Sequence, residues 1–237
     1  MVFARTAAMA FNRYADRLID SKNERTVRRE IPAGIVSERS ALWLVILSSV
    51  LFVMVTYTIN NLCFFLSPVA LLVVLGYSYT KRFTWLCHLV LGIGLSLAPI
   101  GAYLAVTGTF DWLPLFFSFS VIFWVSGFDI IYALQDEQFD KSNQLYSLPA
   151  YLGKSKALKL SSLLHMCSAA FIIMAGFAGS FGITYWVGAF VFCALLIYQH
   201  SLVKADDLSR VNVAFFSTNG IASLVFASFV IAELFLN

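Results

Sequence analysis

Residues 113–140 read LPLFFSFSVIFWVSGFDIIYALQDEQFD, an apolar run that ends in acidic side chains. The apolar segment that contains most of it, 112–134, is long enough to cross a hydrocarbon core of roughly 30 Å as a helix. Asp136 and Asp140 follow with i, i+4 spacing, so both carboxylates share one face of a helix. The stretch therefore predicts a membrane-spanning helix that carries two acidic groups to one membrane face.

Segments of similar length and apolarity recur along the whole chain of 237 residues. Hydrophobic residues make up 60% and charged residues only 12%, and the mean hydropathy of +0.82 lies far from that of a soluble domain. Residues 1–20 resemble the end of one further span. We therefore predict an all-α, polytopic membrane bundle of eight transmembrane helices that forms a single transmembrane domain, residues 1–237. The other predicted spans are 40–59, 62–80, 85–106, 156–178, 183–203 and 211–236.

Basic residues occupy every second connection between these spans, whereas the connections 58–62, 107–111 and 178–183 contain no Lys or Arg. Cytoplasmic loops carry an excess of Lys and Arg, so the basic face is predicted to be cytoplasmic. The chain is thus expected to be a multi-pass protein of a lipid bilayer, in a bacterial plasma membrane. The basic residues of these connections are Lys22, Arg25, Arg28, Arg29, Arg39, Lys81, Arg82, Lys141, Lys154, Lys156, Lys159, Lys204 and Arg210.

Another acidic pair occurs near the start of the chain, where Asn12, Asp16 and Asp20 are spaced i, i+4, i+8. An amide oxygen and two carboxylates form a hard oxygen set that suits Mg²⁺. Like charges at this spacing repel each other, which favours a bound cation. Arg13, one residue along, could pair with the acidic stripe or with phosphate. The alternative is an ordinary helix end with interfacial charges.

Both acidic pairs are predicted to lie on the cytoplasmic face, so they could meet in one cavity that opens to the cytoplasm. On a regular helix Asp129, Asp136 and Asp140 lie within about 20° of one face. Asp129 is the deepest, and an ionisable group at such depth is a functional-site hypothesis. Tyr132 and Gln135 flank the same surface. The alternative for Asp129 is a simple pairing with an Arg of the bundle.

Three further polar groups are interpreted with alternatives. Tyr77 and Lys81 are spaced i, i+4 and precede Arg82, while Arg28 lies in the first basic connection; these groups could bind diphosphate. The positive-inside rule alone would also place the cations there. His88 is expected to be a structural histidine, with a cavity-facing position as the alternative. Asn212 and Asn219, spaced i, i+7, are expected to form hydrogen bonds between helices.

The motifs Asn12-x-x-x-Asp16-x-x-x-Asp20, Tyr77-x-x-x-Lys81-Arg82 and Asp136-x-x-x-Asp140 together resemble the UbiA superfamily of intramembrane prenyltransferases. The resemblance runs over essentially the whole chain. Within the superfamily, residues 127–136 (GFDIIYALQD) are most similar to quinone-pathway members that prenylate 4-hydroxybenzoate, and close relatives serve menaquinone synthesis.

This resemblance implies nine helices around a cavity, a polyprenyl diphosphate donor bound through Mg²⁺ and an aromatic acceptor. It assigns the metal to Asp16, Asp20, Asp136 and Asp140, and catalysis to Asp129, Lys81 and Arg82. It assigns substrate binding to Asn12, Arg13, Arg28, Tyr77, Lys81, Tyr132 and Gln135. The family's first helix has no counterpart here, so a missing first transmembrane helix is expected. No nucleic-acid partner is expected, because the basic connections account for the net charge of +3.

Several alternatives remain open on the sequence alone. The same chemistry could act on a naphthoquinone, a glycerol phosphate lipid or a porphyrin. An inactive truncated form is a second alternative, and a cation-coupled membrane transporter is one from a different class. The sequence predicts neither the chain length of the donor nor the oligomeric state.

Overall fold

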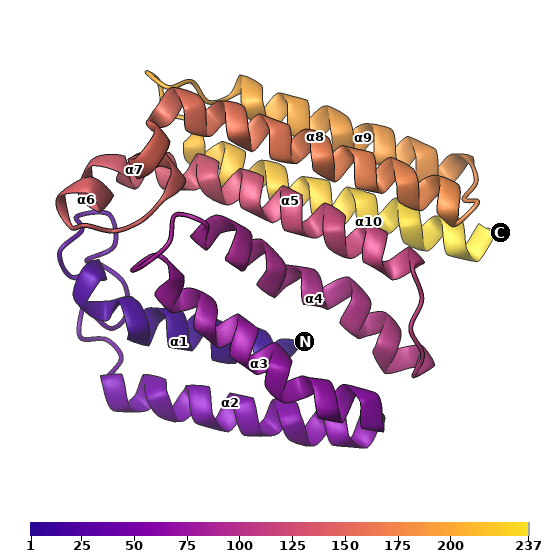
Figure 1. The fold of residues 1–237 in the computed structure, drawn as a ribbon, viewed down its shortest axis with the longest axis horizontal. Helices are drawn as coiled ribbons and strands as arrows, with labels where there is room; N and C mark the ends of the chain where they lie inside the picture. The colour runs from indigo at the N-terminus through magenta and orange to yellow at the C-terminus, as the bar shows by residue number, and fades with distance from the viewer. Residues whose placement is uncertain (237) are drawn as a thin grey trace. The chain divides into compact units, whose positions relative to one another are not determined.

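The computed structural model describes residues 1–236, which form helices and short connections without any β-strand (Figure 1). Seven helical segments in this part of the chain are long and apolar enough to cross a membrane. They are α2 (Glu38–Ile59), α3 (Asn61–Thr80), α4 (Cys87–Thr107), Leu113–Ser142 including α5 (Leu113–Ala133), α8 (Lys154–Ala178), α9 (Ile183–Ser201), and Val213–Leu236, made of η2 (Val213–Thr218) and α10 (Asn219–Leu236).

The predicted all-α membrane bundle is confirmed, and these segments begin and end within a few residues of the predicted spans, except that the segment containing α5 continues to Ser142. The predicted count of eight is not confirmed. Residues 2–20 do form a helix, α1 (Val2–Asp20), but it is not one of the seven apolar segments. Arg5, Arg13 and Arg17 interrupt its apolar residues and make it amphipathic.

The chain divides into two compact units. The first contains residues 1–84 and 101–110, and in it α1 packs against α2 and α3, which also pack against each other. Asn60 organises one end of this unit. Its Oδ1 accepts a hydrogen bond from the Cys63 N–H at 2.8 Å and so caps α3, while its Nδ2 donates to the Leu104 carbonyl at 2.9 Å.

The second unit contains residues 85–100 and the chain from residue 111 onward. Here α5 packs against α8, α8 against α9, and α9 against α10 (Figure 1). Asp111 lies two residues before the start of α5, and its Oδ1 accepts a hydrogen bond from the Leu113 N–H at 2.8 Å. Three short helices follow α5, namely η1 (Leu134–Asp136), α6 (Glu137–Ser142) and α7 (Leu148–Leu152).

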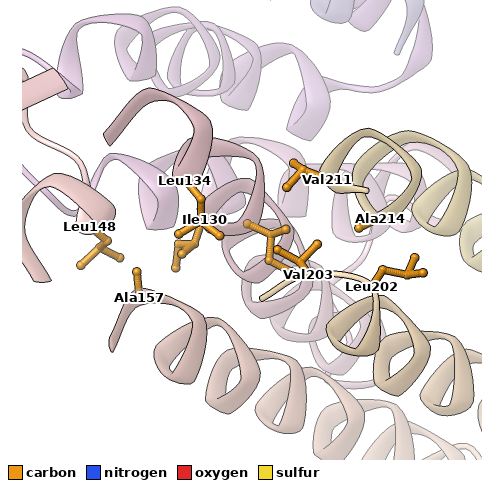
Figure 2. Close-up of a cluster of buried hydrophobic side chains, with 9 residues drawn as sticks. Ile130, Leu134, Leu148, Ala157, Leu202, Val203, Val211 and Ala214 are labelled. Atoms are coloured by element: carbon orange, nitrogen blue, oxygen red, sulfur yellow. The ribbon is translucent and has the colours of Figure 1, made fainter. Parts of the chain in front are cut away.

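A buried apolar cluster of the second unit joins the end of α5 to the start of the last membrane segment (Figure 2). Ile130 and Leu134 are fully buried, and Val211 and Ala214 are equally buried in the same cluster. The cluster is completed by Ile131, Leu148, Ala157, Leu202 and Val203. Because protein interiors are close-packed, this core fixes the residues just after Asp129 against those around η2.

The contact between α5 and α8 depends on Gly127, two residues before Asp129. A Cβ added to Gly127 would lie 2.3 Å from His165 Cδ2, so only glycine allows this approach. Ser161 donates a hydrogen bond to the Gly127 carbonyl at 2.7 Å. The sequence therefore places its smallest residue at a close approach of α8 to α5, two residues before Asp129.

Candidate functional site

The first aspartate motif lies in the last half of α1. Asn12 donates a hydrogen bond from Nδ2 to Asp16 Oδ2 at 3.0 Å, as their i, i+4 spacing predicts. This bond leaves Asn12 Oδ1 as a further oxygen beside the carboxylates. Asp16 is half-buried and Asp20 is buried, 4% exposed. The first unit thus holds an amide and two carboxylates on one face of α1.

Cationic side chains of the same unit lie against both carboxylates. Arg82 Nη2 is 3.5 Å from Asp16 Oδ1, and the same atom donates a hydrogen bond to the Ala15 carbonyl. Arg29 Nη1 lies 2.8 Å from Asp20 Oδ1 and 2.9 Å from Asp20 Oδ2. The structure therefore brings Arg82 to the first motif and adds Arg29, a cation of the first basic connection that is not among the residues assigned to the site by the family resemblance.

The remaining predicted groups of the first unit lie in different surroundings. Arg13 forms an ion pair with Glu30 at 3.3 Å, so it turns toward the first basic connection. Arg28 is exposed, Tyr77 is half-buried near the end of α3, and Lys81 directly follows α3. The Arg82 guanidinium lies 4.9 Å from the centre of the Tyr79 ring, a cation–π contact that orients it.

The first motif fits a divalent cation by its charge as well as by its donor atoms. Burial raises the pKa of the Asp16 carboxyl, the neighbouring Asp20 raises it further, and Arg82 and Lys81 oppose the shift. Two neighbouring carboxylates that repel each other favour a shared cation, and Mg²⁺ prefers such oxygen ligands. The residues present therefore fit Mg²⁺.

The second motif differs in shape from its prediction. Asp136 (6% exposed) and Asp140 (fully buried) do not continue α5, because η1 is a 3₁₀ turn between α5 and α6. A 3₁₀ turn has 3.0 residues per turn instead of 3.6, so three residues rotate the following chain by roughly 60° more than an α-helix would. The expectation that Asp129, Asp136 and Asp140 share one face within about 20° is thus wrong.

Asp129 has a partner that sequence reasoning did not assign to it. His88 Nδ1 lies 2.6 Å from Asp129 Oδ2, and His88 is only 3% exposed. The Leu148 N–H donates to His88 Nε2 at 3.3 Å, so Nε2 is the acceptor and the imidazole proton is on Nδ1. The Nδ1–H therefore donates to the Asp129 carboxylate, and the alternative of a pairing between Asp129 and an Arg is replaced by this histidine.

Tyr132 and Gln135 follow Asp129 on the same segment. Gln135 donates from Nε2 to the Tyr132 carbonyl at 3.2 Å. The Tyr132 ring stacks on Phe215 with ring centres 4.1 Å apart, and Phe216 meets its edge at 5.9 Å. The second unit therefore combines a histidine–aspartate pair with an aromatic contact one helical turn later.

Asp16 and Asp20 belong to the first unit, and Asp136 and Asp140 belong to the second. Among residues 1–236, no group of three or more His, Cys, Asp or Glu side chains is arranged to hold a metal ion. The assignment of the four aspartates to one metal site stays a prediction.

Residues 1–236 contain seven helical segments of membrane length and two acidic pairs near helix ends, which define a polytopic membrane protein with acidic groups at helix ends. The sequence model of the UbiA prenyltransferase family matches residues 1–232. The chain therefore belongs to the UbiA prenyltransferase family. This membership confirms the predicted resemblance and the predicted enzyme class, a prenyltransferase.

Individual relatives agree with this assignment. The 4-hydroxybenzoate octaprenyltransferase of Nitrosospira multiformis is 30% identical over 230 residues, which cover 97% of this chain and 79% of that protein. The enzyme of the same name from Aliivibrio fischeri is 28% identical over 229 residues, 95% of this chain and 79% of its own.

Solved structures agree as well. The apo structure of a UbiA homolog from Aeropyrum pernix K1 has a TM-score of 0.91 and 32% identity, and the match covers 98% of this chain and 86% of that one. A UbiA homolog from Archaeoglobus fulgidus, bound to DMAPP and Mg²⁺, has a TM-score of 0.75 at 20% identity, covering 97% and 83%. At that identity the likeness shows a shared fold.

Proposed function

We propose that this chain transfers a polyprenyl group from a polyprenyl diphosphate to an aromatic acceptor of the 4-hydroxybenzoate type, as a step of quinone biosynthesis. The observation that carries the proposal is the hydrogen bond between His88 and Asp129. Asp129 lies seven residues before Asp136 on the same membrane segment. This segment offers an oriented carboxylate for the acceptor and an acidic pair for the diphosphate. The names of the Nitrosospira and Aliivibrio relatives support the same acceptor.

Asp16, Asp20, Asp136 and Asp140 are proposed to hold Mg²⁺. When bound, the metal would supply positive charge that neutralises the diphosphate. Support comes from the two carboxylates of each pair and from the raised pKa of Asp16, whose repulsion from Asp20 a cation would relieve. The Archaeoglobus homolog, which was solved with DMAPP and Mg²⁺, agrees with this choice.

Lys81 and Arg82 are proposed to stabilise the leaving diphosphate. In this step the allylic C–O bond breaks and its electron pair leaves with the diphosphate oxygen. Preorganised cations stabilise such developing charge at little reorganisation cost, and Arg82 is already oriented by Tyr79 and the Ala15 carbonyl. The other proposed donor contacts are Asn12, Arg13, Arg28 and Tyr77.

Asp129 is proposed to act on the acceptor, with Tyr132 and Gln135 beside it. A ring carbon of the acceptor captures the allylic cation, and the ring then loses a proton, which the Asp129 carboxylate can accept. The Nδ1–H of His88 holds this carboxylate in one orientation. An apolar surrounding excludes the water that would otherwise capture the cation.

The chain is further proposed to work as one transmembrane prenyltransferase domain with its acidic pairs toward the cytoplasm of a bacterial cell. The family match over residues 1–232 supports a single domain. The concentration of Lys and Arg in alternate connections supports the orientation.

The proposal is tested by measuring pyrophosphate release and prenylated product with purified protein in lipid nanodiscs, with Mg²⁺ and with EDTA. Asp16→Asn should lower the rate by about 100-fold, since it removes a charge from the diphosphate site. Asp206→Asn, an exposed aspartate in the connection between α9 and η2, is the matched control and should retain the rate. Equal rates for wild type and Asp16→Asn would refute the proposed metal site.

The acceptor is tested in the same assay with 4-hydroxybenzoate, 1,4-dihydroxy-2-naphthoate and a glycerol phosphate lipid offered separately. We expect product with 4-hydroxybenzoate at a rate that exceeds the others. If product formed only with one of the other two acceptors, the proposed prenyl transfer would be supported and the proposed acceptor would be refuted.

A further inference from the structure

The last membrane segment begins with a π-helical turn, η2, before it continues as α10. A π-helix forms hydrogen bonds from residue i to i+5, which is a rare geometry that occurs frequently at functional sites. Val211 and Ala214 bury their side chains on either side of the start of this turn. The turn is thus anchored in the core of the second unit (Figure 2).

Side chains satisfy the backbone carbonyls that the π turn displaces. Gln199 of α9 donates from Nε2 to the Ala214 carbonyl at 2.8 Å. Asn219 donates from Nδ2 to the Phe215 carbonyl at 2.8 Å. The amide groups of Gln199 and Asn219 are joined as well, because Gln199 Nε2 lies 3.1 Å from Asn219 Oδ1.

Two more side chains complete this arrangement. Thr218 donates from Oγ1 to the Val213 carbonyl at 3.2 Å, and Trp124 of α5 donates from Nε1 to Asn219 Oδ1 at 3.2 Å. We call these four residues, Trp124, Gln199, Thr218 and Asn219, the polar lock. The polar lock connects α5, α9 and α10 around the π turn.

The polar lock contains one buried polar atom that is not satisfied. Gln199 is fully buried, and its Oε1 has no hydrogen-bond partner among the described residues. A buried acceptor without a partner costs folding free energy, and such groups in native structures call for an explanation. Both hydrogens of the Gln199 amide are used to hold the π turn and Asn219.

What the polar lock fixes is Phe215. Its ring stacks on Tyr132 with ring centres 4.1 Å apart and an interplanar angle of 25°. Phe128 meets the Phe215 ring edge-on at 5.4 Å. Tyr132 and Phe215 are only half-buried, so each keeps part of its ring surface outside the core.

Tyr132 lies between the two acidic sites of its segment, three residues after Asp129 and four before Asp136. At 1.5 Å per residue, Tyr132 is roughly 4.5 Å along the helix axis from Asp129. In the proposed reaction the allylic cation forms where diphosphate leaves and is captured where the acceptor lies. The Tyr132–Phe215 pair therefore lies between the proposed position of the diphosphate and the proposed position of the acceptor.

We propose that Tyr132 and Phe215 form an aromatic wall that stabilises the allylic cation and excludes water until the acceptor captures it, and that Gln199 and Asn219 are positioning residues for Phe215. This inference rests on the proposed prenyl transfer. Aromatic faces attract cations through their negative quadrupole. After the C–O bond breaks, capture by a ring carbon gives prenylated acceptor and a proton, whereas capture by water gives prenyl alcohol and a proton.

The test is the ratio of prenyl alcohol to prenylated acceptor at saturating 4-hydroxybenzoate, measured together with total pyrophosphate. Phe215→Leu should raise the alcohol share by roughly 3- to 30-fold, the range expected for loss of a cation–π contact. Gln199→Met, which keeps the length but loses the amide, should shift the ratio in the same direction. Phe215→Tyr keeps the ring and should keep the wild-type ratio.

Phe190→Leu is the matched control, because Phe190 on α9 is 74% exposed and should leave the ratio unchanged. An unchanged ratio in Phe215→Leu, whether or not total pyrophosphate falls, would overturn the aromatic wall and leave a structural role. A wild type without Mg²⁺-dependent pyrophosphate release would instead refute the proposed function. Thermal transitions of all variants identify any misfolded one, and Phe215→Met, a flexible apolar replacement, then takes the place of Phe215→Leu.

Discussion

His88 and Asp129 are 41 residues apart in the chain, yet the imidazole Nδ1 and the carboxylate Oδ2 lie 2.6 Å apart. The Leu148 N–H on the opposite ring nitrogen fixes the tautomer, so the proton of His88 points at the carboxylate. Asp129 is thus held as an oriented acceptor for a second hydrogen bond or a proton.

The first prediction concerns this pair. His88→Ala should lower the kcat of prenyl transfer by about 10-fold or more, because loss of a hydrogen bond to a charged group costs roughly 1.5–3 kcal/mol. His88→Asn places an amide donor near the position of Nδ1 and should restore part of the rate. Steady-state kinetics with 4-hydroxybenzoate measure both. The control is Ser120→Ala, which is also on α5 and breaks a buried hydrogen bond to Ser168 of α8. An equal loss of kcat in Ser120→Ala would show a general packing effect.

Gly127 gives a prediction about stability. Gly127→Ala should lower the free energy of unfolding by about 1–3 kcal/mol, since the added methyl group would lie 2.3 Å from His165 Cδ2. Gly220→Ala is matched to it, because nothing lies within 4 Å of an added Cβ there; alanine should be neutral or stabilising in that helix. Thermal unfolding in detergent compares the two variants. Equal transitions would contradict the close approach of α8 to α5.

Glu233 caps a helix from a distance in sequence. It is 2% exposed, and its carboxylate accepts hydrogen bonds from the N–H groups of Gly182 and Tyr185 (the latter at 3.2 Å) at the start of α9. Glu233→Ala should destabilise the protein by about 1–3 kcal/mol, because it removes the partner of the buried Tyr185 N–H and of the half-buried Gly182 N–H. Glu233→Gln keeps one oxygen and should cost less.

The measurement for Glu233 is again thermal unfolding in detergent. Ser223→Ala on the exposed face of α10 removes only a bond to the carbonyl of Gly220 in the same helix and should change little. A Glu233→Ala variant as stable as Ser223→Ala would mean that the carboxylate does not hold α9.

Arg82 yields a prediction about donor binding. Arg82→Lys keeps the charge but loses the planar fork that contacts Asp16, the Ala15 carbonyl and the Tyr79 ring. The KM for polyprenyl diphosphate should therefore rise by about 10-fold while the KM for the acceptor stays the same. Arg210→Lys, an exposed cation in another basic connection, is the control. A rise in both KM values would indicate that Arg82 stabilises the fold of the first unit instead of binding the donor.

Most of the fold could be predicted from the sequence, because an apolar run of membrane length admits few structures other than a helix. The departures occur where a helix changes its pitch. Asp136 is the last residue of a 3₁₀ turn and Asp140 follows that turn, and no residue in Leu134–Asp136 distinguishes such a turn from a regular helix. Local rules that assume 3.6 residues per turn then place the side chains wrongly.

The last segment repeats this lesson. The sequence predicts that Asn212 and Asn219, spaced i, i+7, form hydrogen bonds between helices, and the π turn lies between them. Asn219 is buried and bonded to helices α5 and α9, which confirms its expected role. Asn212 is exposed. His88 illustrates another limit, since its partner Asp129 is distant in sequence and only packing brings the two together.

The π turn also affects how related sequences can diverge in activity. A turn with i to i+5 bonds holds one residue more than a turn with i to i+4 bonds, so η2 is equivalent to a one-residue insertion in a membrane helix. Deleting one residue of Val213–Thr218 would allow a regular α-helical turn to replace the π turn, and would leave the span, its hydropathy and the orientation of the helix on either side almost unchanged. Phe215 lies inside the turn, so the deletion would change the direction of its ring relative to Tyr132. A single alignment gap at this position could therefore separate relatives of identical topology by activity.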